Sequence, residues 1–94
     1  MELYSFEDFA TLRGKMRTLP HGQLLFIADR SLQPEQLREL DADDDFTVIC
    51  ARENHGAQLF YCIAHSSDTQ LALGVVKNLI ESEGGSDIES ARIN

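Results

Sequence analysis

The residues of this chain that could carry chemistry are two cysteines, three histidines and a run of acidic side chains. Cys50 and Cys62 both stand among apolar neighbours, where a thiol usually behaves as a small buried hydrophobe. Two cysteines are too few for a disulfide-stapled scaffold. We therefore expect both thiols to be reduced and to lie buried beside each other, with no metal.

The histidines match no metal or catalytic pattern. The spacings of His21, His55 and His65 fit no zinc motif, and His55 stands in a predicted turn, away from both cysteines. Cys62 and His65 are close in sequence, but an offset of three along a strand puts their side chains on opposite faces. Phosphate-binding glycine loops and a nucleophile elbow are also missing. We expect no cofactor, no metal and no enzymatic activity.

The acidic run is the strongest local signal. Residues 35–45 hold six acidic side chains and one arginine, a net charge of −5, whereas residues 1–34 sum to zero. A calcium loop starting at Asp41 would need glycine and glutamate where Phe46 and Arg52 stand. The run is therefore either a solvated loop that aids solubility or a contact surface for a basic partner. We predict the contact surface, formed by Glu35, Glu39, Asp41, Asp43, Asp44 and Asp45.

The length and composition of the chain are typical of one globular domain. The chain has 94 residues, of which 43% are hydrophobic and 26% are charged. Sixteen acidic against eight basic residues give a net charge of −8, which argues against direct contact with nucleic acid or an anionic membrane. No apolar run is long enough for a membrane span, and the acidic N-terminus is unlike a secretory signal. We expect a cytoplasmic protein, in the host cytoplasm if a phage encodes it.

The elements follow from the spacing of apolar side chains. Helical spacing predicts three helices, over residues 2–19, 34–40 and 66–83. Short apolar, β-branched and aromatic runs predict three strands, over residues 23–28, 46–51 and 57–65. Ser5 is the expected N-cap of the first helix, and Ser67 with Gln70 forms a capping box for the last.

This order, α-β-α-β-β-α, predicts an α+β sandwich with a small three-stranded sheet, mixed or antiparallel, and helices packed on one face. The short turn between the last two strands predicts an antiparallel hairpin. The first strand can pair by a parallel crossover or in antiparallel fashion. We expect residues 1–85 to form a single compact domain, closed by Gly84 and Gly85, and residues 86–94 to form a mobile C-terminal tail.

Two further features bear on contacts. The last predicted helix has a wide apolar arc over Leu71–Ile80, which packs on the sheet and can also serve a homodimer or another partner. Arg13 and Arg17 lie one turn apart within the apolar side of the first helix. We expect them to pair with the 41–45 loop inside the chain, since long basic side chains cover apolar surface while their charges reach outward.

In size, acidity and lack of catalytic motifs the chain resembles the small inhibitors of phages and bacteria: anti-CRISPR proteins, nuclease inhibitors and bacteriocin immunity proteins. That resemblance implies a stand-alone phage counter-defence or immunity-like protein that blocks a basic, nucleic-acid-handling partner through charge complementarity. The predicted β-α-β-β-α stretch is also similar to ACT-type modules, which implies the alternative of a small regulatory or ligand-sensing dimer. A compact enzyme is the third possibility.

Overall fold

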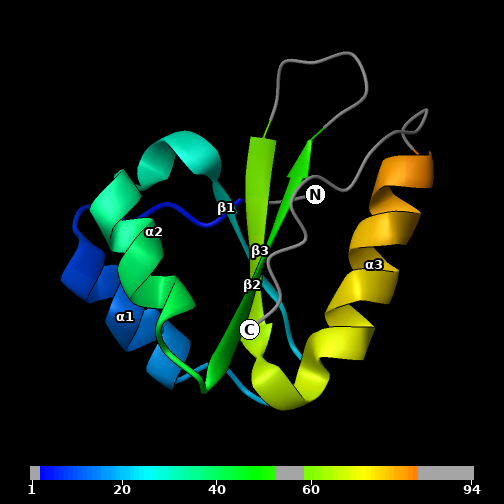
Figure 1. Cartoon of the computed structure of the whole chain (residues 1–94), viewed down its shortest axis with the longest axis horizontal. Helices are drawn as coiled ribbons and strands as arrows, with labels where there is room; N and C mark the ends of the chain where they lie inside the picture. Colours follow the sequence, from blue (N-terminus) through cyan, green and yellow to red (C-terminus); the bar gives the residue numbers. More distant parts are fainter. Residues whose placement is uncertain (1–2, 53–58, 83–94) are drawn as a thin grey trace.

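The computed structural model describes residues 3–52 and 59–82. The chain order of its elements is α1 (Phe9–Arg17), β1 (Leu25–Ala28), α2 (Pro34–Asp41), β2 (Phe46–Arg52), β3 (Leu59–His65) and α3 (Thr69–Ser82). Single 3-10 turns at Asp29–Ser31 and Ser66–Asp68 precede α2 and α3. The predicted α+β fold and its order α-β-α-β-β-α are confirmed (Figure 1).

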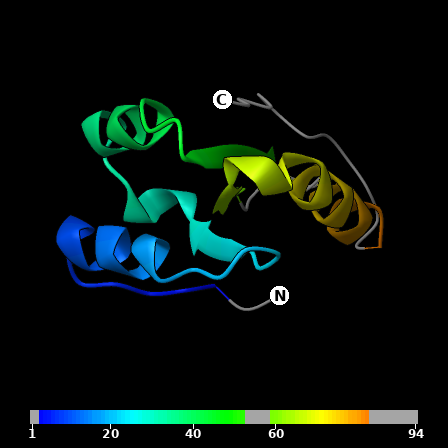
Figure 2. The same cartoon turned by 90° about the horizontal axis from the view of Figure 1, so that it is seen from below.

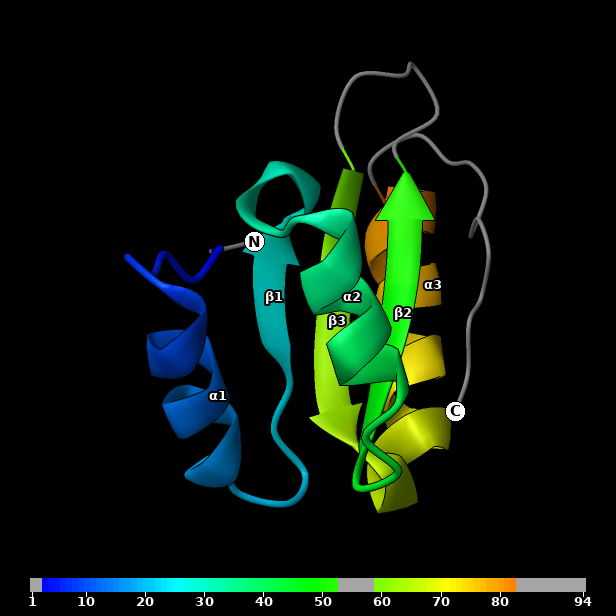
Figure 3. The ribbon, with the colours of Figure 1, turned by 60° about the vertical axis from the view of Figure 1, so that its left-hand side comes forward.

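The three strands form an antiparallel sheet in the order β1-β3-β2. Ile63, in the middle of β3, is opposite Leu25 of β1 on one side and Val48 of β2 on the other. The predicted hairpin of β2 and β3 is therefore confirmed. The first strand, whose pairing the sequence left open, pairs with β3 in antiparallel fashion. β1 and β2 consequently run in the same direction on either side of β3, and α2 joins them across one face of the sheet (Figure 3).

Helices cover both faces of this sheet. Figures 1 and 2 show α1 and α2 on one side and α3 on the other, so the expectation that all helices lie on one face is wrong. The reason is that neighbouring side chains of the strands are apolar in both directions. Val48 and Ile63 face α1 and α2, whereas Ile49 and Cys62 face α3, and each of these four is at most 2% exposed.

Each face therefore has its own apolar cluster. The cluster under α1 and α2 consists of Leu12, Met16, Leu19, Leu25, Ile27, Leu40, Phe46, Val48 and Ile63. The cluster under α3 consists of Ile49, Ala51, Phe60, Cys62, Ala64, Ala72 and Val76. A buried polar contact joins the second face to the start of α3, because the hydroxyl oxygens of Thr47 and Thr69 lie 2.7 Å apart.

The first helix begins later than its pattern predicts. Asp8 caps α1 by accepting the backbone N–H of Thr11 at 2.8 Å, so Ser5 is not the N-cap. The preceding segment lies beside the sheet instead, where the N–H of Tyr4 donates to the carbonyl of Phe26 at 2.7 Å. Tyr4 and Phe6 thus pack against the first apolar cluster from a non-helical segment.

The last helix also starts differently. A 3-10 turn, Ser66–Asp68, comes before α3, and the hydroxyl of Thr69 donates to the carbonyl of Ser66 at 2.7 Å. Ser67 does not form the predicted capping box with Gln70. Its hydroxyl oxygen lies 3.2 Å from Nδ1 of His21 instead, so a residue expected to cap the start of the helix takes part in a long-range contact.

The two cysteines lie on opposite faces. Cys62 is opposite Ile49, and Cys50 is opposite Tyr61, so the pair is one position out of register. Cys62 is fully buried under α3, whereas Cys50 is half-buried on the side of α2. The expectation that they lie buried beside each other is therefore wrong, and a disulfide between them is sterically excluded because their side chains leave the sheet in opposite directions.

Several expectations fall on residues outside the described part of the chain. These are the hairpin turn with His55, the first two residues of the predicted third strand, the Gly84–Gly85 helix stop and the 86–94 tail. Within the described part, no helix combines the length and the apolar character that crossing a membrane requires.

Candidate functional site

The N-terminal half of the predicted acidic surface lies on α2. Gln33 and Gln36 form a capping box at the start of this helix, in which the backbone N–H of Gln33 donates to Oε1 of Gln36 at 2.9 Å. Glu35 in the first turn and Glu39 one turn later are both exposed. A negative charge near a helix N-terminus interacts favourably with the helix dipole, so the carboxylate of Glu35 stabilises α2.

The next two predicted residues are drawn into the molecule. Asp41 is the last residue of α2 and is half-buried. It lines a cavity of 340 Å³ between α2 and the sheet, together with Leu37, Val48 and Tyr61. Asp43 is also half-buried, and one carboxylate oxygen lies 2.8 Å from a guanidinium nitrogen of Arg13. These two aspartates therefore contribute little to an outer surface.

The Arg13–Asp43 ion pair confirms the predicted contact between the first helix and the acidic loop. Partial burial acts to raise the pKa of the Asp43 carboxyl. The hydrogen bond from Arg13, the N–H of Asp45 and the charges of Arg13 and Arg17 together outweigh that effect. The pKa of Asp43 therefore lies below its ordinary value, and the pair joins α1 to the loop that follows α2.

Replacing Asp43 by asparagine is expected to lower the free energy of unfolding by about 1.5–3 kcal/mol at pH 7, because a charge-assisted hydrogen bond is lost. A carboxyl whose folded pKa is depressed stabilises the fold above its unfolded pKa and loses that effect as pH falls through the folded value. The difference between wild type and variant should thus shrink below about pH 4. Urea unfolding at pH 7 and pH 3 measures it, and an equal difference at both would contradict the ion pair.

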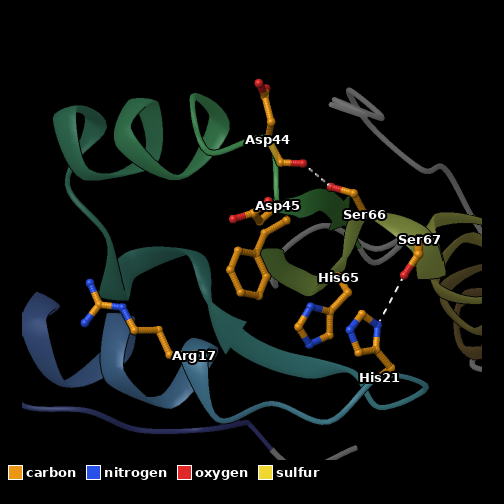
Figure 4. Close-up of a pocket in the computed structure, with 8 residues that line it drawn as sticks. Arg17, His21, Asp44, Asp45, His65, Ser66 and Ser67 are labelled. Atoms are coloured by element: carbon orange, nitrogen blue, oxygen red, sulfur yellow. Dashed lines mark hydrogen bonds between the residues drawn. The ribbon is translucent and has the colours of Figure 1, made fainter.

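Asp44 and Asp45 are exposed, while their backbone is held firmly. The hydroxyl of Ser66 donates to the carbonyl of Asp44 at 2.6 Å, and the N–H of Ser66 donates to the carbonyl of Asp45 at 2.9 Å. Asp43 also accepts the N–H of Asp45 at 3.0 Å. Figure 4 shows the Asp44 side chain pointing away from the protein. Both carboxylates are therefore presented to solvent from a fixed loop.

A groove of 470 Å³ lies beside this loop. Its lining residues are Arg17, His21, Asp44, Asp45, Phe46, His65, Ser66 and Ser67 (Figure 4). Three of these residues stack their rings: the Phe46 and His65 centroids are 5.1 Å apart, and those of His65 and His21 are 3.9 Å apart. Sequence patterns did not reveal this cluster because its members are distant in the chain. The available signals were the Pro-His-Gly turn and the Ser-Ser-Asp segment after His65.

The groove also brings Ser67, His21 and Asp68 together, but not as an acyl-transfer site. The hydroxyl of Ser67 is 3.2 Å and the carboxylate of Asp68 is 3.9 Å from the same ring nitrogen, Nδ1 of His21. A catalytic triad needs the nucleophile and the acid on opposite nitrogens of the imidazole. Among residues 3–52 and 59–82, no three histidine, cysteine, aspartate or glutamate side chains gather closely enough to hold a metal ion.

The exposed members of the predicted set form what we call the acidic surface. It consists of Glu35, Glu39, Asp44 and Asp45. Arg38, which is also exposed on α2, offsets one of the four negative charges. Carboxylates in this setting bind cationic groups, and exposed charges of this kind act mainly on the rate of encounter with a partner.

Comparison of the chain with protein-family models, with curated proteins and with solved structures finds no match.

Proposed function

We propose that this protein is a small inhibitor that binds a basic partner, a larger protein that handles nucleic acid, and blocks it. The observation that carries the proposal is the acidic surface, in which Glu35, Glu39, Asp44 and Asp45 are all exposed. These charges belong to a chain with a net charge of −8, so the wider field of the molecule reinforces them. A basic groove that normally holds nucleic acid is the complementary surface.

The fixed backbone under the acidic surface supports the same proposal. Two hydrogen bonds from Ser66 and one to Asp43 hold the loop in place, so little ordering is needed when a partner arrives. Each exposed ion pair adds only about 0–1 kcal/mol. The charges should therefore act together on the association rate, while apolar contacts determine how long the complex lasts.

Only some of the six predicted acidic residues are suitable for substitutions that test binding. Neutralising Asp43 would break its ion pair with Arg13, so a variant that included it would confuse folding with binding. Asp41 is half-buried at the end of α2 and has the same disadvantage. The suitable test variant replaces the acidic surface alone, as E35Q/E39Q/D44N/D45N. A matched control, E7Q/E83Q/D87N/E89Q, removes four negative charges elsewhere in the sequence; three of its positions lie outside the described residues.

We expect the acidic-surface variant to associate about tenfold more slowly than wild type at low salt, and with a flatter salt dependence, because electrostatic steering is lost. The control variant should stay close to wild type. The measurement is the association rate, at low and moderate salt, with the basic protein that wild type retains from its source cells. If both variants slow equally, net charge alone is responsible. If neither slows, the run serves solubility and the proposal is wrong.

One observation favours the alternative, a regulatory dimer. Leu71 on α3 is 46% exposed, although Ala72 and Val76 of the same helix are fully buried against the sheet. The wide apolar arc of this helix is thus only partly covered within the chain. Sedimentation of wild type and of L71E tests this alternative. A dimer for wild type and a monomer for L71E would favour the regulatory dimer over the inhibitor.

A further inference from the structure

The cavity between α2 and the sheet shares no residue with the acidic surface. Its lining residues are Pro34, Leu37, Arg38, Asp41, Val48, Cys50 and Tyr61. Four of them belong to α2 and three to β2 and β3, and Figure 3 shows α2 lying in front of the sheet. The cavity volume of 340 Å³ is near the lower end of the range of about 300–1,000 Å³ for ligand sites. A ligand that fits this cavity is therefore small.

Apolar side chains line this cavity from both the helix and the sheet. Val48 of β2 is 2% exposed and belongs to the buried cluster under α1 and α2. Leu37 of α2 and Tyr61 of β3 pack against the same cluster and are half-buried. An apolar group placed between them leaves water and contacts both layers of the fold, which is favourable.

Two side chains of opposite charge line the same cavity. Arg38 and Asp41 are three positions apart on α2, so both lie on one side of the helix. Arg38 is exposed, whereas Asp41 is half-buried. A ligand with a single charge is attracted by one of these side chains and repelled by the other. A ligand that carries both charges is complementary to both.

The end of α2 determines which charge of such a ligand goes where. Asp41 is the last residue of this helix, and the helix dipole favours a positive charge at that end. Asp41 makes a further contact within the chain, but a carboxylate has about four acceptor sites and can also receive an ammonium group. The guanidinium of Arg38 suits a carboxylate, because its N–H groups can donate to both carboxylate oxygens.

We propose that this cavity binds a free α-amino acid with a large apolar side chain. The ammonium group of the ligand pairs with Asp41, and its carboxylate pairs with Arg38. Its side chain packs against Leu37, Val48 and Tyr61. The cavity is formed within one chain, so binding needs neither a second copy nor a basic partner. The site is therefore independent of the function proposed for the acidic surface.

An NMR titration of the full chain with L-phenylalanine tests the site. We expect saturable shifts of the backbone amide signals of Arg38, Cys50 and Tyr61, with a dissociation constant of about 1 mM or tighter. The amide signals of Ala72 and Val76, which belong to the cluster on the other face of the sheet, should not move. Glycine carries both charges without an apolar side chain, and it should bind at least about tenfold more weakly.

Two probes that each lack one charge separate the two ionic contacts. L-Phenylalanine methyl ester keeps only the ammonium group, and N-acetyl-L-phenylalanine keeps only the carboxylate. Each should bind about tenfold more weakly than L-phenylalanine. Arg38→Gln should abolish the difference between L-phenylalanine and the ester, and Asp41→Asn should abolish the difference between L-phenylalanine and the N-acetyl compound. Arg30→Gln is the matched control and should keep both differences, because Arg30 is also exposed but is not among the lining residues.

Three results would overturn the proposal, and the first two need only wild type. Absence of saturable shifts at Arg38, Cys50 and Tyr61, or shifts confined to Asp44 and Asp45, would show that the cavity takes no amino acid. Equal affinities for L-phenylalanine, the ester and the N-acetyl compound would show that the two charges select nothing. The third is an unchanged preference over the ester in Arg38→Gln, a variant expected to fold because Arg38 is exposed and glutamine favours helix.

Discussion

Cys50 is expected to react with a soluble thiol reagent at least about a hundred times faster than Cys62 in the folded protein at pH 8. Cys62 is fully buried under α3, and burial raises the pKa of its thiol to about 12. Because the thiolate is the reactive form, a thiol with that pKa has roughly a thousandfold less of it at pH 8 than an ordinary cysteine. Cys50 is half-buried and lines the 340 Å³ cavity beside α2.

Reagent labelling followed by peptide mass mapping measures the two rates. In urea the rates should converge, because unfolding gives both thiols the same environment. A Cys50→Ser variant should lose the fast phase, and a Cys62→Ala variant should keep it. Equal rates in the native protein would contradict the observed register, since they would place both side chains in similar surroundings.

This result would differ from what the sequence predicts, and the reason is register. Both cysteines stand in apolar runs, and the hairpin was correctly predicted to bring the two strands together. Side chains alternate between faces with a period of two, so a shift of one position moves a residue to the other side of the sheet. Cys62 is opposite Ile49 rather than Cys50. Composition cannot determine that shift when both faces of a strand are apolar.

The same physical limit explains the placement of the helices. The strands of this sheet are apolar on both faces, which calls for cover on both sides. In the sequence, consecutive residues of β2 and β3 are apolar. In the structure these neighbours lie on opposite faces, Val48 and Ile63 on one and Ile49 and Cys62 on the other. It does not say which helix takes which face. The order of elements was predictable because helical and strand periodicities differ; their arrangement depends on contacts between distant segments.

The candidate site was predictable to a similar degree. Charge along the chain identified the acidic run, and the spacing of Arg13 predicted its contact with the loop after α2. That same contact removes Asp43 from the outer surface, which only the fold reveals. The turn and the segment that hold His21 and His65 are visible in the sequence, but nothing local indicates that a turn after α1 meets the end of β3, so the stack of the two rings could not be predicted. Local patterns thus indicated the charged surface and missed the cluster made by tertiary contacts.

Replacing Ile63 by alanine is expected to cost about 2–5 kcal/mol of unfolding free energy. Ile63 is fully buried in the central strand, where it is opposite both Leu25 and Val48. A domain of this size has a total stability of about 5–14 kcal/mol, so one substitution removes a large part of it. Leu71→Ala is the matched control, since Leu71 is 46% exposed and its loss should cost about 0.5 kcal/mol or less.

This substitution also tests whether the two apolar clusters form one folding unit. Ile63 faces α1 and α2, yet its neighbours in β3, Cys62 and Ala64, belong to the cluster under α3. Because β2 and β3 contribute side chains to both clusters, loss of packing on one face should unfold the other. Helical circular dichroism and tyrosine fluorescence should therefore give coincident urea transitions for Ile63→Ala. A cost below about 1 kcal/mol would contradict the close packing of Ile63. Two separate transitions would show that the cluster under α3 folds independently of the cluster under α1 and α2.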